Sequence, residues 1–137
     1  MPKRRHRVII DTNLWISYLL SKGLRKLDSV LVRREIILLF SQELLDELVD
    51  VTQRPKFTKY FQPENVSSLL YLLSLRAELI PVVSEVDDCR DDKDNFLLAL
   101  AKDGNATHLI TGDKDLLVLD NYLHTKILTI EAYLRSL

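Results

Sequence analysis

The chain has 137 residues, of which 47% are hydrophobic and 28% charged, and its formal net charge is −1. This composition excludes disordered, collagen-like and mucin-like chains and predicts a single packed domain over residues 1–137. The lone Cys89 excludes an internal disulfide and favours a reducing, cytoplasmic setting. The basic start is followed by too short an apolar run for a signal peptide, and no run reaches the length of a membrane span.

Short apolar runs rich in branched residues alternate with helical patterns along the chain. Strands are predicted over residues 7–10, 36–40, 79–83, 107–111 and 126–129. Helices are predicted over residues 13–20, about 24–34, 41–52 with Ser41 as N-cap, 63–77, from the end of the acidic loop 85–92 to about 102, shortly after 112–113, and 130–137. Pro81 places the third strand at a sheet edge. Together these elements predict a doubly wound α/β domain with a parallel five-stranded sheet between two helical layers.

The carboxyl ends of the first and fourth strands both present an aspartate. In doubly wound sheets the functional site lies beyond the carboxyl ends of the strands, where the strand order reverses. Asp11 follows the first strand and Asp113 follows the fourth. If these strands are neighbours, as in a 3-2-1-4-5 order, the two carboxylates face each other across the crevice. Either aspartate alone would also suit as the N-cap of the next helix.

A glutamate on the helix over 41–52 can reach the same crevice. The buried stripe of that helix is predicted to contain Leu44, Leu45, Leu48 and Val51. At ~100° per residue, Glu47 lies nearer to this stripe than the other acids of the helix, which are Glu43, Asp46 and Asp50. The alternative is a boundary glutamate paired with a lysine or arginine.

The acidic run around Asp91, Asp92 and Asp94 contains more carboxylates than capping requires. Asp91 or Asp92 is the better candidate for the cap of the following helix. Asp94, in the first turn and directly before the apolar part of that helix, is expected to lie close to the sheet.

Four such carboxylates would need a counter-charge if they met. At roughly 5 Å and an effective dielectric of ~20, each like-charged pair repels by about 3 kcal/mol, so the cluster requires a cation or protons. Oxygen ligands without Cys or His suit Mg²⁺ or Mn²⁺, with positions left open for a substrate phosphate. The chemistry that this arrangement favours is phosphodiester hydrolysis by metal-activated water.

Three basic clusters offer contacts for a phosphate backbone. They are Lys3, Arg4, Arg5 and Arg7; Lys22, Arg25, Lys26, Arg33 and Arg34; and Arg54, Lys56 and Lys59. If they converge on one face, they would hold a nucleic acid beside the acidic centre. Ordinary solvated helix faces are an equal alternative.

Residues 8–17, 41–57, 89–96 and 109–116 together resemble the PIN domain family of Mg²⁺- or Mn²⁺-dependent ribonucleases, most closely its prokaryotic VapC-type toxins. The resemblance implies a parallel sheet in 3-2-1-4-5 order, an RNA substrate, a cognate antitoxin protein and a homodimer. It also implies a set of site residues: Asp11, Glu47, Asp94 and Asp113 as the acidic metal site, Asp115 as an outer acid, and Thr12 or Asn13 orienting the first carboxylate or the substrate. Because Lys93 interrupts the acidic run, Asp91 and Asp92 remain alternatives to Asp94.

Two other function classes compete with a nuclease. A PIN-like domain without catalysis would serve as a binding or assembly module. A phospho-acceptor receiver domain needs a pair of acids after the first strand and a lone acceptor aspartate after a central one, and neither is found here.

Several conspicuous side chains are expected to serve packing. Trp15, Tyr18, Phe40 and Phe57 are predicted core residues, His108 a packed or surface residue, and Cys89 inert. Tyr71 and Leu72 belong either to the core or to an apolar surface for a dimer partner or antitoxin.

Overall fold

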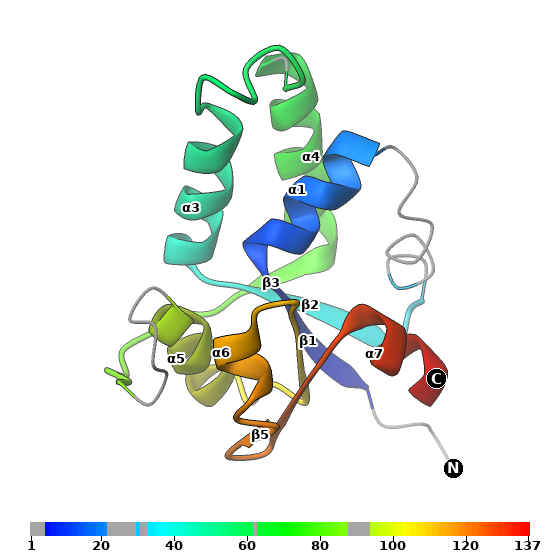
Figure 1. Ribbon diagram of the computed structural model, residues 1–137, viewed down its shortest axis with the longest axis vertical. Coiled ribbons are helices and arrows are strands. Elements are labelled where there is room, and N and C mark those ends of the chain that lie inside the picture. The colour runs from blue at the N-terminus through cyan, green and yellow to red at the C-terminus, as the bar shows by residue number, and fades with distance from the viewer. Residues whose placement is uncertain (1–4, 22–29, 31–32, 62, 88–93) are drawn as a thin grey trace.

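The computed structural model describes residues 5–21, 30, 33–61, 63–87 and 94–137 (Figure 1). Its elements in chain order are β1 (His6–Ile10), α1 (Thr12–Ser21), β2 (Ile36–Phe40), α3 (Gln42–Thr52), α4 (Pro63–Arg76), β3 (Ala77–Leu79), α5 (Asn95–Asp103), β4 (His108–Ile110), α6 (Lys114–Leu117), β5 (Asn121–Tyr122), β6 (Thr125–Leu128) and α7 (Ile130–Ser136). Apart from the additional strand β5, the order of the described strands and helices follows the prediction. The helix expected over about 24–34 falls mostly outside the described residues.

The six strands form one sheet in the order β3-β2-β1-β4-β6-β5. Every neighbouring pair is parallel except β5 with β6. In the centre, Val8 of β1 pairs with Leu38 on one side and His108 on the other. The five parallel strands therefore confirm the predicted 3-2-1-4-5 order, with β1 and β4 adjacent where the order reverses.

The edge strand β3 begins earlier than predicted, at Ala77 instead of Leu79. Its ladder with β2 ends where the Ile80 N–H donates to the Phe40 carbonyl at 2.7 Å. Pro81 follows and has no N–H to donate, so the pairing stops there. The prediction of an edge strand is confirmed, and the predicted range 79–83 is wrong.

The short strand β5 was not predicted. It pairs antiparallel with β6, Tyr122 facing Thr125 across a two-residue connection. In that connection Leu123 has a φ of 53°, a conformation usually taken by glycine or asparagine in tight hairpins. Because leucine gives no turn signal, the sequence pattern does not reveal this hairpin.

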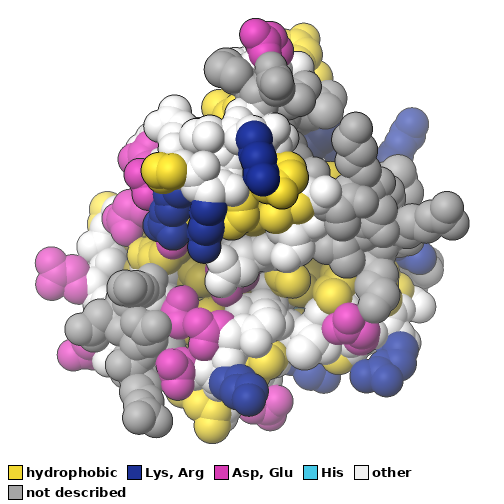
Figure 2. All heavy atoms as spheres, turned by 45° about the horizontal axis from the view of Figure 1, so that its top comes forward, with side chains coloured by type: hydrophobic (Ala, Val, Ile, Leu, Met, Phe, Trp, Pro, Cys, Tyr) yellow, Lys and Arg dark blue, Asp and Glu magenta, His cyan; other side chains and the backbone are white. Residues whose placement is uncertain are grey.

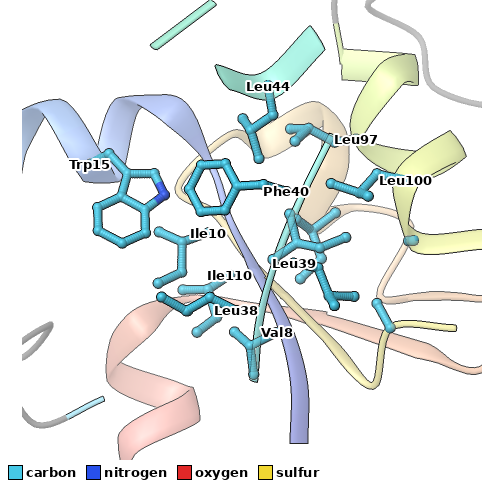
Figure 3. Packing of buried hydrophobic residues seen from close by; sticks show 14 of the residues in the cluster. Val8, Ile10, Trp15, Leu38, Leu39, Phe40, Leu44, Leu97, Leu100 and Ile110 are labelled. Carbon is cyan, nitrogen blue, oxygen red and sulfur yellow. The ribbon is translucent and has the colours of Figure 1, made fainter. Parts of the chain in front are cut away.

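Helices cover both faces of the sheet, as expected. On one face, the rings of Trp15 in α1 and Phe40 in β2 lie 5.8 Å apart (Figure 3). On the other face, the end of α5 approaches β2 so closely that a Cβ on Gly104 would lie 3.0 Å from the Leu39 Cδ1 atom. Figure 1 shows α1, α3 and α4 together on one side and α5 on the other. None of the described helices is long and apolar enough to cross a membrane.

The aromatic residues that were predicted to belong to the core do pack in it. Trp15 and Phe40 are buried, and Tyr18 and Phe57 are partly buried against the same core. At the start of α3, the Ser41 side chain accepts a hydrogen bond from the Leu44 N–H at 3.1 Å, which confirms the predicted N-cap. This cap fixes where α3 begins and so sets which of its acids face the sheet.

A ring cluster lies at the amino ends of β1 and β4. The His6 and His108 ring centroids are 4.6 Å apart, and the His6 Nδ1 atom lies 2.7 Å from the Tyr133 hydroxyl. Burial, followed by the neighbouring His6 and Lys126, lowers the pKa of His108 to about 4. His108 is thus a packed residue, as predicted, at the opposite end of β4 from Asp113.

Stability is expected to fall as the pH drops from about 6.5 to about 4, because unfolding returns His108 to its ordinary pKa of 6.5 and the unfolded chain then binds a proton that the folded chain rejects. For a half-exposed ring the loss is on the order of 2 kcal/mol. Urea unfolding at pH 7.5 and pH 5 measures it. His108→Gln should reduce this pH dependence and the exposed His124→Gln should not; equal pH dependence in all three proteins would contradict the assignment.

Candidate metal centre

Asp11 lies at the carboxyl end of β1, where the strand passes directly into α1. Its backbone N–H donates to the Ile110 carbonyl at 3.0 Å, and its own carbonyl accepts from Leu14 and Trp15 in the first turn of the helix. The side chain is only 7% exposed. The buried run before Asp11 and the helix after it therefore hold this carboxylate at the predicted edge of the sheet.

Thr111 connects the ends of β1 and β4. This residue is fully buried, and its hydroxyl donates to the Asp11 Oδ2 atom at 2.7 Å. The same Oγ1 atom accepts a hydrogen bond from the Asp113 N–H at 3.0 Å. Asp113 in turn caps α6, its Oδ1 atom accepting from the Asp115 N–H at 2.8 Å. One hydroxyl thus fixes the Asp11 side chain and the Asp113 backbone together.

Thr111 was not among the predicted site residues. Its position in the sequence could have indicated this role, because Thr111 is a hydroxyl residue at the carboxyl end of a central strand, directly before the predicted Gly112-Asp113 turn. A threonine there is also an ordinary strand residue, so its role emerges only from the pairing of β1 with β4.

Glu47 is the acid of α3 that faces the site. It is half-buried, whereas Glu43, Asp46 and Asp50 are exposed. The Thr12 hydroxyl donates to the Glu47 Oε2 atom at 3.1 Å, across the packed pair α1 and α3. Thr12 therefore orients Glu47, while Asn13 supplies a backbone hydrogen bond to the Asp11 carboxylate.

Asp11 interacts electrostatically with two other carboxylates. Burial raises the pKa of Asp11, the Thr111 hydroxyl opposes this, and the charge of Asp113 raises it further. Burial also raises the pKa of Glu47, the Thr12 hydrogen bond opposes this, and the charge of Asp11 adds to the rise. Asp11 is the shared neighbour, so these three acids form the electrostatic centre of the site.

Asp94 lies at the start of α5, a helix that contacts α3. It is buried, with 9% of its surface exposed, and occupies the N-cap position, without a side-chain cap hydrogen bond. The prediction placed it in the first turn and gave the cap to Asp91 or Asp92. Those two residues lie outside the described part of the chain.

The donor set fits a hard divalent cation in type. Asp11, Glu47 and Asp113 offer only oxygen atoms, and burial of Asp11 among like charges favours uptake of a positive ion. Within the described residues, no group of three or more His, Cys, Asp or Glu side chains is already spaced to hold a metal. In donor type and charge, the residues present suit Mg²⁺ or Mn²⁺.

The predicted basic clusters do not all converge on this site. Arg7 is the second residue of β1, near the opposite end of that strand from Asp11, and its guanidinium contacts Glu78 at 3.0 Å and the Gly104 carbonyl at 2.8 Å. Arg33 pairs with Glu35 at 3.2 Å, and residues 1–4 and 22–29 lie outside the described ranges. From the third cluster, the charge of Arg54 lowers the pKa of Glu47, after the larger effects of burial, Thr12 and Asp11.

A family model for the PIN domain matches residues 7–115. The chain belongs to the PIN domain family. This PIN domain is 30% identical over 147 aligned residues to an uncharacterized protein of Methanocaldococcus jannaschii, covering 99% of this chain and 94% of that protein. Its fold is similar to a chain of the crystal structure of VapBC2 from Rickettsia felis bound to a DNA fragment from their promoter, with a TM-score of 0.58 and 17% identity over 88% of this chain and 98% of that one.

Proposed function

We propose that this PIN domain is a metal-dependent endoribonuclease that hydrolyses RNA phosphodiester bonds. The observation that carries the proposal is the buried Asp11, which interacts with Asp113 and Glu47 at the carboxyl ends of two adjacent parallel strands. Membership of the PIN family supports it. Nuclease chemistry on a polyanion requires a concentrated positive charge beside the reacting phosphate, and these acids supply the means to hold one.

In this proposal Asp11, Glu47, Asp94 and Asp113 hold Mg²⁺ or Mn²⁺, with Asp115 as an outer acid. When bound, the ion would activate water and neutralise charge on the phosphate. The chain's own residues fix the ligands: the Thr111 hydroxyl orients Asp11 and the Thr12 hydroxyl orients Glu47. The exposed Asn13 side chain is available to the substrate.

We further propose that the protein is the toxin of a toxin–antitoxin pair, acting in the cytoplasm with a cognate antitoxin protein and as a homodimer. The fold similarity to a VapBC2 chain supports this. On the face formed by α3, α4 and β3, Tyr71 and Leu79 are 65% and 56% exposed, and an apolar cavity of about 430 Å³ lies between the two helices. The Leu72 side chain, the other residue predicted for such a surface, lies outside the described part.

A second candidate function is a PIN module that binds or assembles without cleaving. It is favoured by one observation: the described His, Cys, Asp and Glu side chains include no group of three or more with metal-binding spacing. In such a module the acids would serve the fold, as Asp113 does by capping α6.

Incubation of labelled single-stranded RNA with Mg²⁺, Mn²⁺ or EDTA tests the nuclease. We expect cleavage with either ion, none with EDTA, and a loss of about 100-fold or more in Asp113→Asn. Asp46→Asn, which neutralises an exposed acid of α3, is the matched control and should cleave normally. Normal cleavage by Asp113→Asn would place the site elsewhere. No cleavage by the unmodified protein, together with no Mn²⁺ binding by calorimetry, would favour the binding module.

A further inference from the structure

We propose that residues 54–60, the segment after α3, form a binding track for single-stranded RNA that leads into the acidic centre. This inference rests on the proposed nuclease function, because it assigns the surface on which that enzyme holds its substrate. It is carried by the charge, exposure and aromatic content of the segment and by its position relative to Glu47.

Positive charge is concentrated on this segment. Residues 53–61 contain Arg54, Lys56 and Lys59 and no acid, in a chain whose net charge is −1. All three cations are exposed. Arg54 contacts Asp50 at 3.5 Å in a solvated pair, and among the described residues neither lysine has a carboxylate partner. Cations without such partners are free to release counterions when a phosphate backbone binds.

The segment lies on the same side of α3 as the site. Arg54 lies two residues beyond the end of α3, where its N–H donates to the Val51 carbonyl at 3.2 Å. Its guanidinium contacts Asp50, the i+3 neighbour of Glu47 on α3, at 3.5 Å. The charges of Arg54 and Glu47 interact across this distance. Figure 2 shows a group of Lys and Arg side chains directly above a group of Asp and Glu side chains on one face of the molecule. A strand held by the cations would therefore run toward the acids.

Aromatic rings alternate with the lysines. The Lys56 Nζ atom lies 4.9 Å from the centre of the Phe57 ring, and the Lys59 Nζ atom lies 5.1 Å from that of Tyr60. Phe57 packs against Phe61, which is only 8% exposed, with ring centres 5.9 Å apart. These two rings anchor the segment to the core. Tyr60 is left 56% exposed beside a lysine.

An exposed ring beside exposed lysines favours an unpaired strand over other polyanions. A nucleobase can stack on Tyr60 only when it is not paired in a duplex, while the lysines contact the flanking phosphates without reading sequence. An acidic protein segment would use the charges but gain nothing from a ring that offers a flat face for stacking. The track is thus expected to prefer single-stranded RNA of any sequence over a duplex.

Fluorescence anisotropy with a labelled single-stranded RNA in EDTA measures binding separately from cleavage. We expect Lys56→Gln/Lys59→Gln to weaken binding about 10-fold near 0.1 M salt and to reduce the slope of log affinity against log salt by about 1.4, the value for two lost phosphate contacts. Lys102→Gln/Lys126→Gln changes the net charge equally on other elements and should bind normally. Tyr60→Leu should lose about 5-fold or more, and Tyr60→Phe should lose little.

The outcomes separate the track from the nuclease. Normal binding by the Lys56/Lys59 variant, or equal loss in the Lys102/Lys126 variant, overturns the track even if cleavage is metal-dependent. Equal affinity of Tyr60→Leu and Tyr60→Phe, or tighter binding of a duplex or of poly-glutamate than of the single strand, also overturns it. Binding that depends on Lys56, Lys59 and Tyr60 without any cleavage supports the track and contradicts the nuclease.

Discussion

Asp11→Asn is expected to abolish RNA cleavage and, in the metal-free protein, to raise the melting temperature. The two effects share one cause. Burial raises the pKa of the Asp11 carboxyl, and Asp113 adds to the rise, so the folded state disfavours the charged form more than the unfolded state does. The contribution of this one carboxyl to stability is therefore greatest below its ordinary pKa of 3.8 and is lost as the pH rises through its folded pKa. At neutral pH the charge at Asp11 destabilises the fold.

Asparagine removes that charge and keeps an oxygen that can accept the Thr111 hydrogen bond. The proposed catalysis, in contrast, needs the charge, and loss of a proposed metal ligand should exceed the roughly 10- to 100-fold effect of outer partners. The cleavage rate in the presence of metal measures the loss of activity. Thermal unfolding in EDTA measures the gain in stability. Added Mn²⁺ should then raise the melting temperature of the unmodified protein and leave that of Asp11→Asn unchanged. A variant that is less stable at pH 7, or that cleaves normally, would contradict this account of the site.

Thr111→Val is expected to have the second largest effect, lowering both the stability of the fold and the rate of cleavage. Valine keeps the shape of the buried side chain but cannot donate to Asp11 or accept from the Asp113 N–H. The loss of a hydrogen bond to a charged group predicts about 1.5–3 kcal/mol of lost stability. As a positioning residue, Thr111 should contribute about 10- to 100-fold to cleavage.

The pH profile distinguishes positioning by Thr111 from a merely structural role. Its hydroxyl lowers the pKa of Asp11, so Thr111→Val should move the acidic limb of the cleavage profile to higher pH. Thr125→Val is the matched control, because the buried Thr125 hydroxyl donates to the neutral Ala106 carbonyl at 2.8 Å. That variant should lose stability while its profile stays in place. An unshifted profile in Thr111→Val would limit the residue to packing.

The architecture was predictable because the strands are separated apolar runs and Asp11 and Asp113 follow two of them. Glu47 was predictable because the helical period places it beside the buried stripe of α3, while the other acids of α3 face water. The hydroxyl groups that orient these acids were harder to predict from the sequence. Thr12 was expected to orient Asp11 or the substrate; its backbone bonds to the Asp11 carboxylate, and its hydroxyl also contacts Glu47, which was not predicted.

The features that the sequence pattern did not predict depend on contacts between distant segments. Thr111 becomes part of the site only because β4 pairs with β1. The hairpin of β5 and β6 depends on Leu123 with a positive φ, for which no local residue type is a signal. The start of β3 depends on which residues pair with Leu38 to Phe40, a register that only the assembled sheet decides.

Both borders of the sheet consist of very short strands, which has a consequence for behaviour at high concentration. The border strand β3 has three residues and β5 has two. A foreign strand would find few free backbone donors and acceptors on either side, and Pro81 removes a donor just beyond β3. The missed hairpin therefore protects the longer β6 from pairing with other molecules. Deletion of residues 121–124 would expose that strand, and we expect the protein to become prone to β-type aggregation as a result.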